Sequence, residues 1–259
     1  MMKLLTQNSE LREIGVWNWS LPAHVVTLTD GSKFNVCPSA GACAEVCYAK
    51  NGTYLFPAVR AAHTRNLEWV LYDLSGWRDA MIQELRHKRY RPKGEPRYEL
   101  PDGVTDGWVL DWAARGGAAV RIHDAGDFFN DDYTRAWLDV ARATPDVLFY
   151  AYTKEVELFK RVVEPYAPDN FRWLYSMGGR QDHLVDPDTD RHAEVFTNMK
   201  AIAEAGYTSQ DASDLFAITL PTTRVGIPAN NIPHFRKRQA GRTFSEMQRD
   251  RHTAKPVDA

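Results

Sequence analysis

Three cysteines with the spacing C-x5-C-x3-C lie within residues 37–47, CPSAGACAEVC, and the chain contains no other cysteine. In a cytosolic protein, clustered cysteines more often bind metal or take part in catalysis than form disulfides. Most of the residues between Cys37, Cys43 and Cys47 are small, so the loop can wrap its backbone around a compact group. Its backbone amides could then donate hydrogen bonds to inorganic sulfides.

Three thiolates without a fourth cysteine suit a [4Fe–4S] cluster with one iron open to a small molecule, since most such clusters take four cysteines. Zinc is an alternative, with a histidine completing a Cys₃His site, although structural zinc motifs usually pair cysteines two to four residues apart. In a third interpretation the cysteines are small buried residues that share no ligand. The placement of all three in one loop favours the cluster.

The composition is typical of a soluble globular protein, with 44% hydrophobic and 25% charged residues among 259. A net charge of −2 produces no global field that would attract nucleic acid or an anionic membrane. The N-terminal apolar run is too short for a secretion signal, and no stretch approaches the roughly 18 apolar residues of a membrane span. We therefore expect a cytoplasmic protein without membrane association, in which thiols stay reduced.

Strand and helix patterns alternate over most of the chain. Strands are predicted at 24–29, 118–124, 147–153, 171–177 and 215–221. Helices are predicted at 57–74, 75–90, 108–115, 131–143, 156–166 and 192–206. This alternation implies parallel strands joined by right-handed crossovers.

We expect a single α/β domain over residues 1–259, with a basic C-terminal tail from about residue 230. Its predicted architecture is a complete or partial (β/α) barrel of parallel strands, with the cysteine loop after the first strand. The alternative is an open doubly wound sheet. Arg121 and His123 share one face of a predicted strand, and such a polar face is costly unless it lines a site such as a barrel lumen. The ordinary alternative is that Arg121 pairs with a buried carboxylate.

In both architectures the site lies at the carboxyl ends of the strands. The predicted catalytic residues at these ends are His123, Asp124, Asp127 and Lys154. The residues predicted to bind a cofactor or substrate are Arg121, Tyr48, Tyr152, Ser176, Gly178 and Gly179. The structural alternatives are capping and turn formation for the aspartates, a solvated loop position for the lysine and a plain turn for the glycine pair.

The segments CPSAGACAEVCYAKNG and RIHDAGDFFNDDYTRAWLDVARATPDVLFYAYTK together resemble the phage-encoded gene product 88-like family. The shared features are three cysteines ending in Cys-Tyr-Ala, an Arg…Gly-Asp-Phe segment with Tyr and Trp in the following helix, and a Tyr-Thr-Lys strand end. The resemblance covers roughly residues 15–225. It implies a phage protein made in a bacterial cytoplasm, from a family whose activity is largely uncharacterised.

More distantly, the cysteine loop and expected barrel are similar to those of radical S-adenosylmethionine enzymes. These enzymes place a three-cysteine [4Fe–4S] loop after the first strand of a partial (β/α) barrel. Their usual spacing is C-x3-C-x2-C with an aromatic residue before the last cysteine. The spacing here is longer, and the aromatic residue Tyr48 follows Cys47.

Three functional hypotheses follow. The favoured one is an iron–sulfur enzyme whose open iron binds an unknown small-molecule substrate, through radical chemistry with S-adenosylmethionine as a second cofactor or through Lewis-acid chemistry. The second is a cluster-containing sensing or binding module that contacts host nucleic acid or protein. Its basic tail contains His234, Arg236, Lys237, Arg238 and Arg242, and residues 86–91 form another basic patch. The third is a zinc protein.

Overall fold

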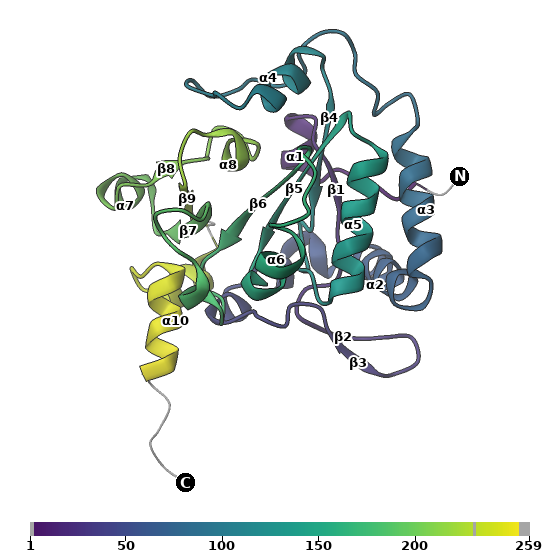
Figure 1. Ribbon diagram of the computed structural model, residues 1–259. Helices are drawn as coiled ribbons and strands as arrows, with labels where there is room; N and C mark the ends of the chain where they lie inside the picture. The colour runs from purple at the N-terminus through teal and green to yellow at the C-terminus, as the bar shows by residue number, and fades with distance from the viewer. Residues whose placement is uncertain (1–2, 230–231, 254–259) are drawn as a thin grey trace.

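A parallel sheet forms the centre of the part of the chain that the computed structural model describes, residues 3–229 and 232–253 (Figure 1). Its seven strands are β1 Trp17–Trp19, β4 Ala118–Ile122, β5 Val147–Thr153, β6 Phe171–Ser176, β7 His192–Phe196, β8 Thr208–Ser209 and β9 Arg224–Pro228. Their order is β1-β4-β5-β6-β7-β9-β8, and every neighbouring pair is parallel.

This sheet confirms the α/β class and the parallel pairing, but it does not close into a barrel within the described residues. β1 and β8 are its two edges, and no ladder joins them. The outer edge of β1 is covered instead by the N-terminal segment, where Thr6 and Asn18 exchange backbone hydrogen bonds of 2.9 and 2.8 Å. The described strands therefore form an open sheet rather than a complete barrel, and the partial barrel stays a prediction.

Residues 24–29, predicted as the first strand of the sheet, belong instead to a small hairpin. β2 Val25–Thr27 pairs antiparallel with β3 Lys33–Asn35, apart from the main sheet (Figure 1). Two of the three side chains in each strand are exposed, so the hairpin offers little buried surface to a core. The true first strand is β1, whose three residues are too few to show an alternating pattern. The cysteine loop follows β1, with the hairpin between them.

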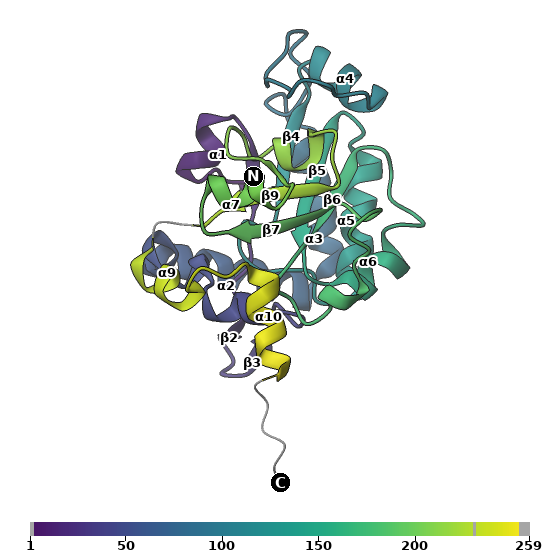
Figure 2. The ribbon, with the colours of Figure 1, turned by 90° about the vertical axis from the view of Figure 1, so that its left-hand side faces the viewer.

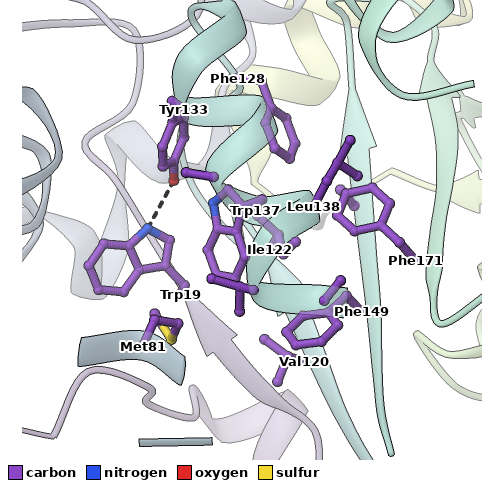
Figure 3. Close-up of a cluster of buried hydrophobic side chains, with 14 of the residues drawn as sticks. Trp19, Met81, Val120, Ile122, Phe128, Tyr133, Trp137, Leu138, Phe149 and Phe171 are labelled. Atoms are coloured by element: carbon purple, nitrogen blue, oxygen red, sulfur yellow. Dashed lines mark hydrogen bonds between the residues drawn. The ribbon is translucent and has the colours of Figure 1, made fainter. Parts of the chain in front are cut away.

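Alternate residues of each strand face opposite sides of the sheet, as a strand's period of two requires. On one side, Val120, Ile122 and Phe149 belong to a large aromatic core with Trp19 and Trp137 (Figure 3). The helices that cover this side are α2 Pro57–Tyr72, α3 Leu74–Leu85, α5 Asp131–Ala143 and α6 Val156–Val162. Helix α5 begins where predicted, because the Asn130 side chain accepts a hydrogen bond from the amide of Tyr133 (2.9 Å).

The opposite side of the sheet is apolar near the amino ends of the strands and polar near their carboxyl ends. Ala119, Leu148 and Val225 lie in a second core cluster. Its cover consists of α1 Ser9–Glu13, α4 Gly107–Ala114 and α8 Phe216–Thr219. Further along the same faces stand Arg121 and Tyr152, which line a cavity rather than a core.

The segment 192–206, predicted as one helix, is a strand followed by a helix. Residues 192–196 form β7, and α7 Met199–Glu204 follows after its cap, Asn198. β7 was missed because His192 and Glu194 are both buried in it, so it lacks the continuous apolar run of a strand inside a parallel sheet.

The segment 215–221, predicted as a strand, contains α8 instead. A short apolar run does not distinguish a buried strand from a buried helix, and α8 lies inside the second core cluster. The strand that completes this part of the sheet is β9, and the sequence analysis found neither β9 nor β8. The other predicted strands and helices are confirmed, with ends that differ by up to five residues.

Two helices after the sheet, α9 Pro233–Gln239 and α10 Phe244–Thr253, lie beside its carboxyl edge (Figure 2). Part of the predicted basic tail is thus helical. Residues 230–231 and 254–259 lie outside the described residues, as does the side chain of His234. None of the described helices is long and apolar enough to cross a membrane.

Removing a buried leucine from the aromatic core should destabilise the protein far more than removing an exposed one. Leu138 on α5 is 1% exposed, whereas Leu110 on α4 is 44% exposed. We expect Leu138→Ala to lower the free energy of unfolding by about 2–5 kcal/mol, because it leaves a cavity. The matched variant Leu110→Ala should change it by less than about 1 kcal/mol. Urea unfolding measures both, and equal losses would contradict this arrangement of the core.

Candidate functional site

A cavity of about 410 Å³ opens at the carboxyl ends of the strands. Its wall combines the cysteine loop with the ends of β4, β5, β6, β7 and β9 and with parts of α9 and α10. The predicted site residues that line it are Cys37, Cys43, Cys47, Tyr48, Arg121, His123, Asp124, Asp127, Tyr152, Lys154 and Ser176. Gly178 and Gly179 do not line the cavity. Residues far apart in sequence thus meet where the parallel sheet predicts a site.

The cysteine loop is fastened to the turn after β6. Ala40 and Gly179 form an isolated antiparallel bridge, and the amide of Cys43 donates to the carbonyl of Gly178 (3.2 Å). The amides of Gly178 and Gly179 both donate to Asp182 (2.8 Å each). An anionic cofactor would have to displace that carboxylate, so the glycine pair serves the turn and the loop in this structure.

Glu155, which the sequence analysis did not single out, fastens the start of the loop. Its carboxylate accepts hydrogen bonds from the amide and the hydroxyl of Ser39, at 2.7 and 2.8 Å. Burial, and then the nearby charge of Asp127, raise the pKa of Glu155 to about 7. The lone glutamate after the Tyr-Thr-Lys strand end carried no signal that set it apart from a solvated one.

Helix α10 covers the loop from the other side. The amide of Ala42 donates to Gln248 (2.7 Å), and Arg251 donates to the carbonyl of Gly41 (2.7 Å). A Cβ atom at position 41 would lie 1.9 Å from Oε1 of Gln248, so a side chain there would have to displace Gln248 from its contact with Ala42. The helix is itself held at its start by Glu194, which accepts from the amide of Phe244 (3.0 Å).

Burial and neighbouring groups raise the pKa of two of the thiols, Cys37 and Cys47. Burial raises the pKa of Cys37 well above its usual value, with smaller contributions from Asp127, Cys43 and Cys47. Burial and the neighbouring Cys43 raise the pKa of Cys47 to about 11. Sγ of Cys37 accepts a hydrogen bond from the amide of His24 (3.3 Å). Within residues 3–229 and 232–253, no group of three or more His, Cys, Asp or Glu side chains is arranged to hold a metal ion.

Lys154 is buried rather than solvated. Its ammonium donates to the carbonyl and hydroxyl of Ser176 (2.8 Å each) and to the carbonyl of Met177 (2.9 Å). No ion pair joins Lys154 to a carboxylate in the described part of the chain. Its positive charge lies close enough to Cys47 to lower the pKa of that thiol, against the larger effect of burial.

Asp127 holds the end of β5. Its carboxylate accepts from the hydroxyl of Thr153 (2.7 Å) and from the amides of Lys154 (2.9 Å) and Phe128 (2.8 Å). Burial raises its pKa to about 6 despite these hydrogen bonds. This geometry matches the turn-forming alternative, and a role as general base would require one of these contacts to open.

Arg121 lies in a buried polar network on the cavity floor. Its guanidinium contacts Asp214 (3.2 Å) and Asp124 (3.7 Å) and lies 4.8 Å from the ring centroid of Tyr152. The hydroxyl of Tyr152 donates to Asp214 (3.1 Å), and that of Tyr48 donates to the carbonyl of Asp124. The ordinary explanation of the polar strand face, a carboxylate partner for Arg121, is therefore realised. Asp214 was not predicted, because it follows no strand.

His123 is buried and neutral. Burial lowers its pKa to about 3, and its Nε2 lies 2.7 Å from the hydroxyl of Tyr133. That hydroxyl oxygen already accepts from Nε1 of Trp19 (3.1 Å; Figure 3), which leaves its hydrogen for Nε2 of His123. The proton of the imidazole then resides on Nδ1, which has no partner among the described residues. His123 thus holds a buried hydrogen-bond donor without a partner, and it is not suited to accept a proton near neutral pH.

A family model described as Gene product 88 matches residues 2–255. The chain belongs to the gene product 88 family. The phage family that the sequence resembled is therefore confirmed.

Two relatives of the chain are the Gene 88 proteins of Mycobacterium phages L5 and D29. They are 33% and 31% identical to it over 134 residues, which is 51% of this chain and 48% of each relative. The chain thus spans about half the length of the curated relatives it matches. No solved structure matches the chain. The similarity to radical S-adenosylmethionine enzymes has no support among these comparisons.

Replacing Glu155 by glutamine should change how stability depends on pH. The folded pKa of about 7 exceeds the ordinary value of 4.5. The stability that this group contributes is therefore full below pH 4.5 and is lost as the pH rises through 7. The amide can keep both contacts to Ser39, so Glu155→Gln should remove this loss.

Thermal or urea unfolding of the metal-free protein at several pH values checks this expectation. The wild type should lose on the order of 2 kcal/mol more than Glu155→Gln between about pH 5 and 7.5. Ser39→Ala is a control that removes one contact without removing the titrating group. Parallel pH profiles for wild type and Glu155→Gln would show that Glu155 titrates as an ordinary exposed carboxyl.

Proposed function

We propose that this phage protein binds a [4Fe–4S] cluster through Cys37, Cys43 and Cys47, with one iron free to bind a small molecule in the cavity. The observation that carries the proposal is that all three cysteines line one cavity. A chain with three thiols in one cavity and no fourth cysteine offers the ligand set of an incompletely coordinated cluster.

The charge around the thiols supports this proposal. Three thiolates bound to such a cluster carry a net negative charge, which is costly to bury without a compensating cation. Lys154 supplies a buried cation beside Cys47, with neutral oxygen partners and no carboxylate partner in the described chain. The Nδ1–H of His123 supplies a buried donor at the same cavity.

The number of cysteines favours a cluster over a single zinc ion. One zinc ion requires four donors to converge at bonding distance, and the described side chains form no such group. A four-iron cluster is larger than a single ion and holds its thiolates farther apart. The described side chains form no group of three or more such residues arranged for any metal ion, so Cys37, Cys43 and Cys47 would have to rearrange around a cluster as well.

When bound, such a cluster supplies either an electron or an open Lewis-acid iron. The chain's own residues would position the substrate. Arg121 and its tyrosine and aspartate partners form the polar floor, and His123 offers a hydrogen-bond donor. Asp124 has both carboxylate oxygens occupied, one by Asn8 (2.9 Å) and Tyr54 (2.6 Å) and the other facing Arg121. Radical chemistry on S-adenosylmethionine and Lewis-acid chemistry both remain compatible with this floor.

The test is anaerobic purification with iron and sulfide analysis and absorption and EPR spectra. We expect about four irons and four sulfides per chain after reconstitution. Cys43→Ser should lose most of this iron, because an alcohol is a poor substitute for a thiolate. Ala44→Ser, which introduces the same side chain at the next position, should keep it.

Two results would overturn the proposal. One is that the reconstituted wild type binds zinc stoichiometrically, or that it binds no metal. The other is equal iron binding by wild type and Cys43→Ser. Addition of S-adenosylmethionine then separates the two chemistries: a changed EPR spectrum supports the radical form, and an unchanged one supports the Lewis-acid form.

A further inference from the structure

A segment rich in unpaired cations lies away from the cavity. Residues 86–97, RHKRYRPKGEPR, contain six arginines and lysines and a single glutamate, although the whole chain has a net charge of −2. The segment leaves the end of α3 and runs toward α4, at the upper end of the molecule in Figure 1. The strands run toward the opposite end, where the cysteine loop lies. The segment is thus separate from the proposed cluster site.

The charges of this segment are not neutralised by nearby carboxylates. Within the part of the chain that the structure describes, none of its six cations forms an ion pair. Nine arginines elsewhere in that part pair with Asp or Glu. The positive potential over residues 86–97 therefore stays concentrated on one surface.

The segment is held in place rather than free. The guanidinium of Arg97 donates to the carbonyls of Arg89 and Arg91. The amides of Lys93 and Gly94 donate to carbonyls of the turn between α4 and β4, at 3.2 and 3.0 Å. These contacts fix the backbone of the segment, so little backbone entropy is lost when a ligand binds.

An aromatic side chain joins the N-terminal segment to this surface. Trp17 has the ammonium of Lys3 5.1 Å from its ring centroid and the guanidinium of Arg89 5.9 Å from it. Tyr90 packs edge-on against the same ring, with 5.2 Å between the centroids. Lys3 thus adds a further exposed cation beside Arg89.

We propose that residues 86–97 and Lys3 form a surface that binds the phosphate backbone of nucleic acid. Several exposed cations without carboxylate partners can neutralise backbone phosphates and release their counterions. Among the exposed large apolar side chains of the described residues, none lies in this segment, so it lacks the apolar anchor of a membrane-binding surface. Contacts of this kind carry no base specificity.

The basic tail is the other nucleic-acid surface considered from the sequence, and it is less available for this role. Arg238 donates to the carbonyl of Glu45 (2.6 Å), and Arg242 pairs with Asp250 (2.7 Å). Arg251 pairs with the side chain of Glu45 (3.1 Å). These arginines hold the C-terminal helices together and onto the cysteine loop.

The test is fluorescence anisotropy with a labelled duplex and a labelled single strand, each of about 30 nucleotides, at several salt concentrations. We expect the wild type to bind both, with affinity that falls linearly on a log–log plot against salt. The variant Arg86→Gln, Lys88→Gln, Arg91→Gln should bind about 10-fold or more weakly near 50 mM salt, with a salt slope smaller by about 2–3. The control Arg236→Gln, Lys237→Gln, Arg249→Gln removes the same charge elsewhere and should bind like wild type.

Two outcomes of the nucleic-acid measurements would overturn the proposal. One is the absence of binding to either nucleic acid by the folded wild type at low salt. The other is an equal loss in the two triple variants, which would show that only net charge matters. Preferential binding to anionic vesicles or polyglutamate over nucleic acid would also overturn it and would indicate a membrane or an acidic protein as the partner. Circular dichroism verifies that each variant is folded.

Discussion

The arrangement of the site depends on the cost of burying charge at the carboxyl edge of the parallel sheet. Arg121 stands on the inner face of β4, where an unpaired guanidinium would be prohibitively unstable. Asp214 and Asp124 neutralise it, and tyrosine hydroxyls satisfy the remaining carboxylate oxygens. This network requires α1, the cysteine loop and the segment before α8 to meet at one place. The cavity is what remains between elements that the network draws together.

A second group of buried polar side chains holds the cysteine loop in place by hydrogen bonds. Asp127 holds the end of β5. The two residues that follow β5 are Lys154, which contacts the turn after β6, and Glu155, which contacts Ser39. The loop is therefore held on the sheet by hydrogen bonds, in addition to the packing of Cys37 against the aromatic core. Such a support orients thiols without filling the space that a bound group would occupy.

Much of the fold could be predicted from the sequence, because its periodic segments coincide with real elements. The strand 147–153 and the helix 131–143 match the structure residue for residue, since each has strong local periodicity and, for the helix, a capping asparagine. The predictions for 192–206 and 215–221 were wrong. In the first segment, buried polar residues interrupt the apolar pattern of the strand β7. In the second, the buried helix α8 has the short apolar run that is typical of a strand. Asp214 and Gln248 escaped notice because their roles arise only from contacts with residues more than 60 positions away. The cysteines were identifiable because all three share one loop.

The contact between Ala42 and Gln248 spans 206 residues. Because Gly41 has no side chain, Gln248 of α10 can lie directly against the cysteine loop. During translation the loop therefore emerges from the ribosome well before its covering helix. At about 5–20 residues per second, the interval is roughly 10–40 s. Throughout that time the cysteine loop lacks the contacts that Gln248 and Arg251 make to Ala42 and Gly41. Once α10 has been made, these contacts cover one side of the loop, while the three cysteines still line the cavity at the carboxyl ends of the strands.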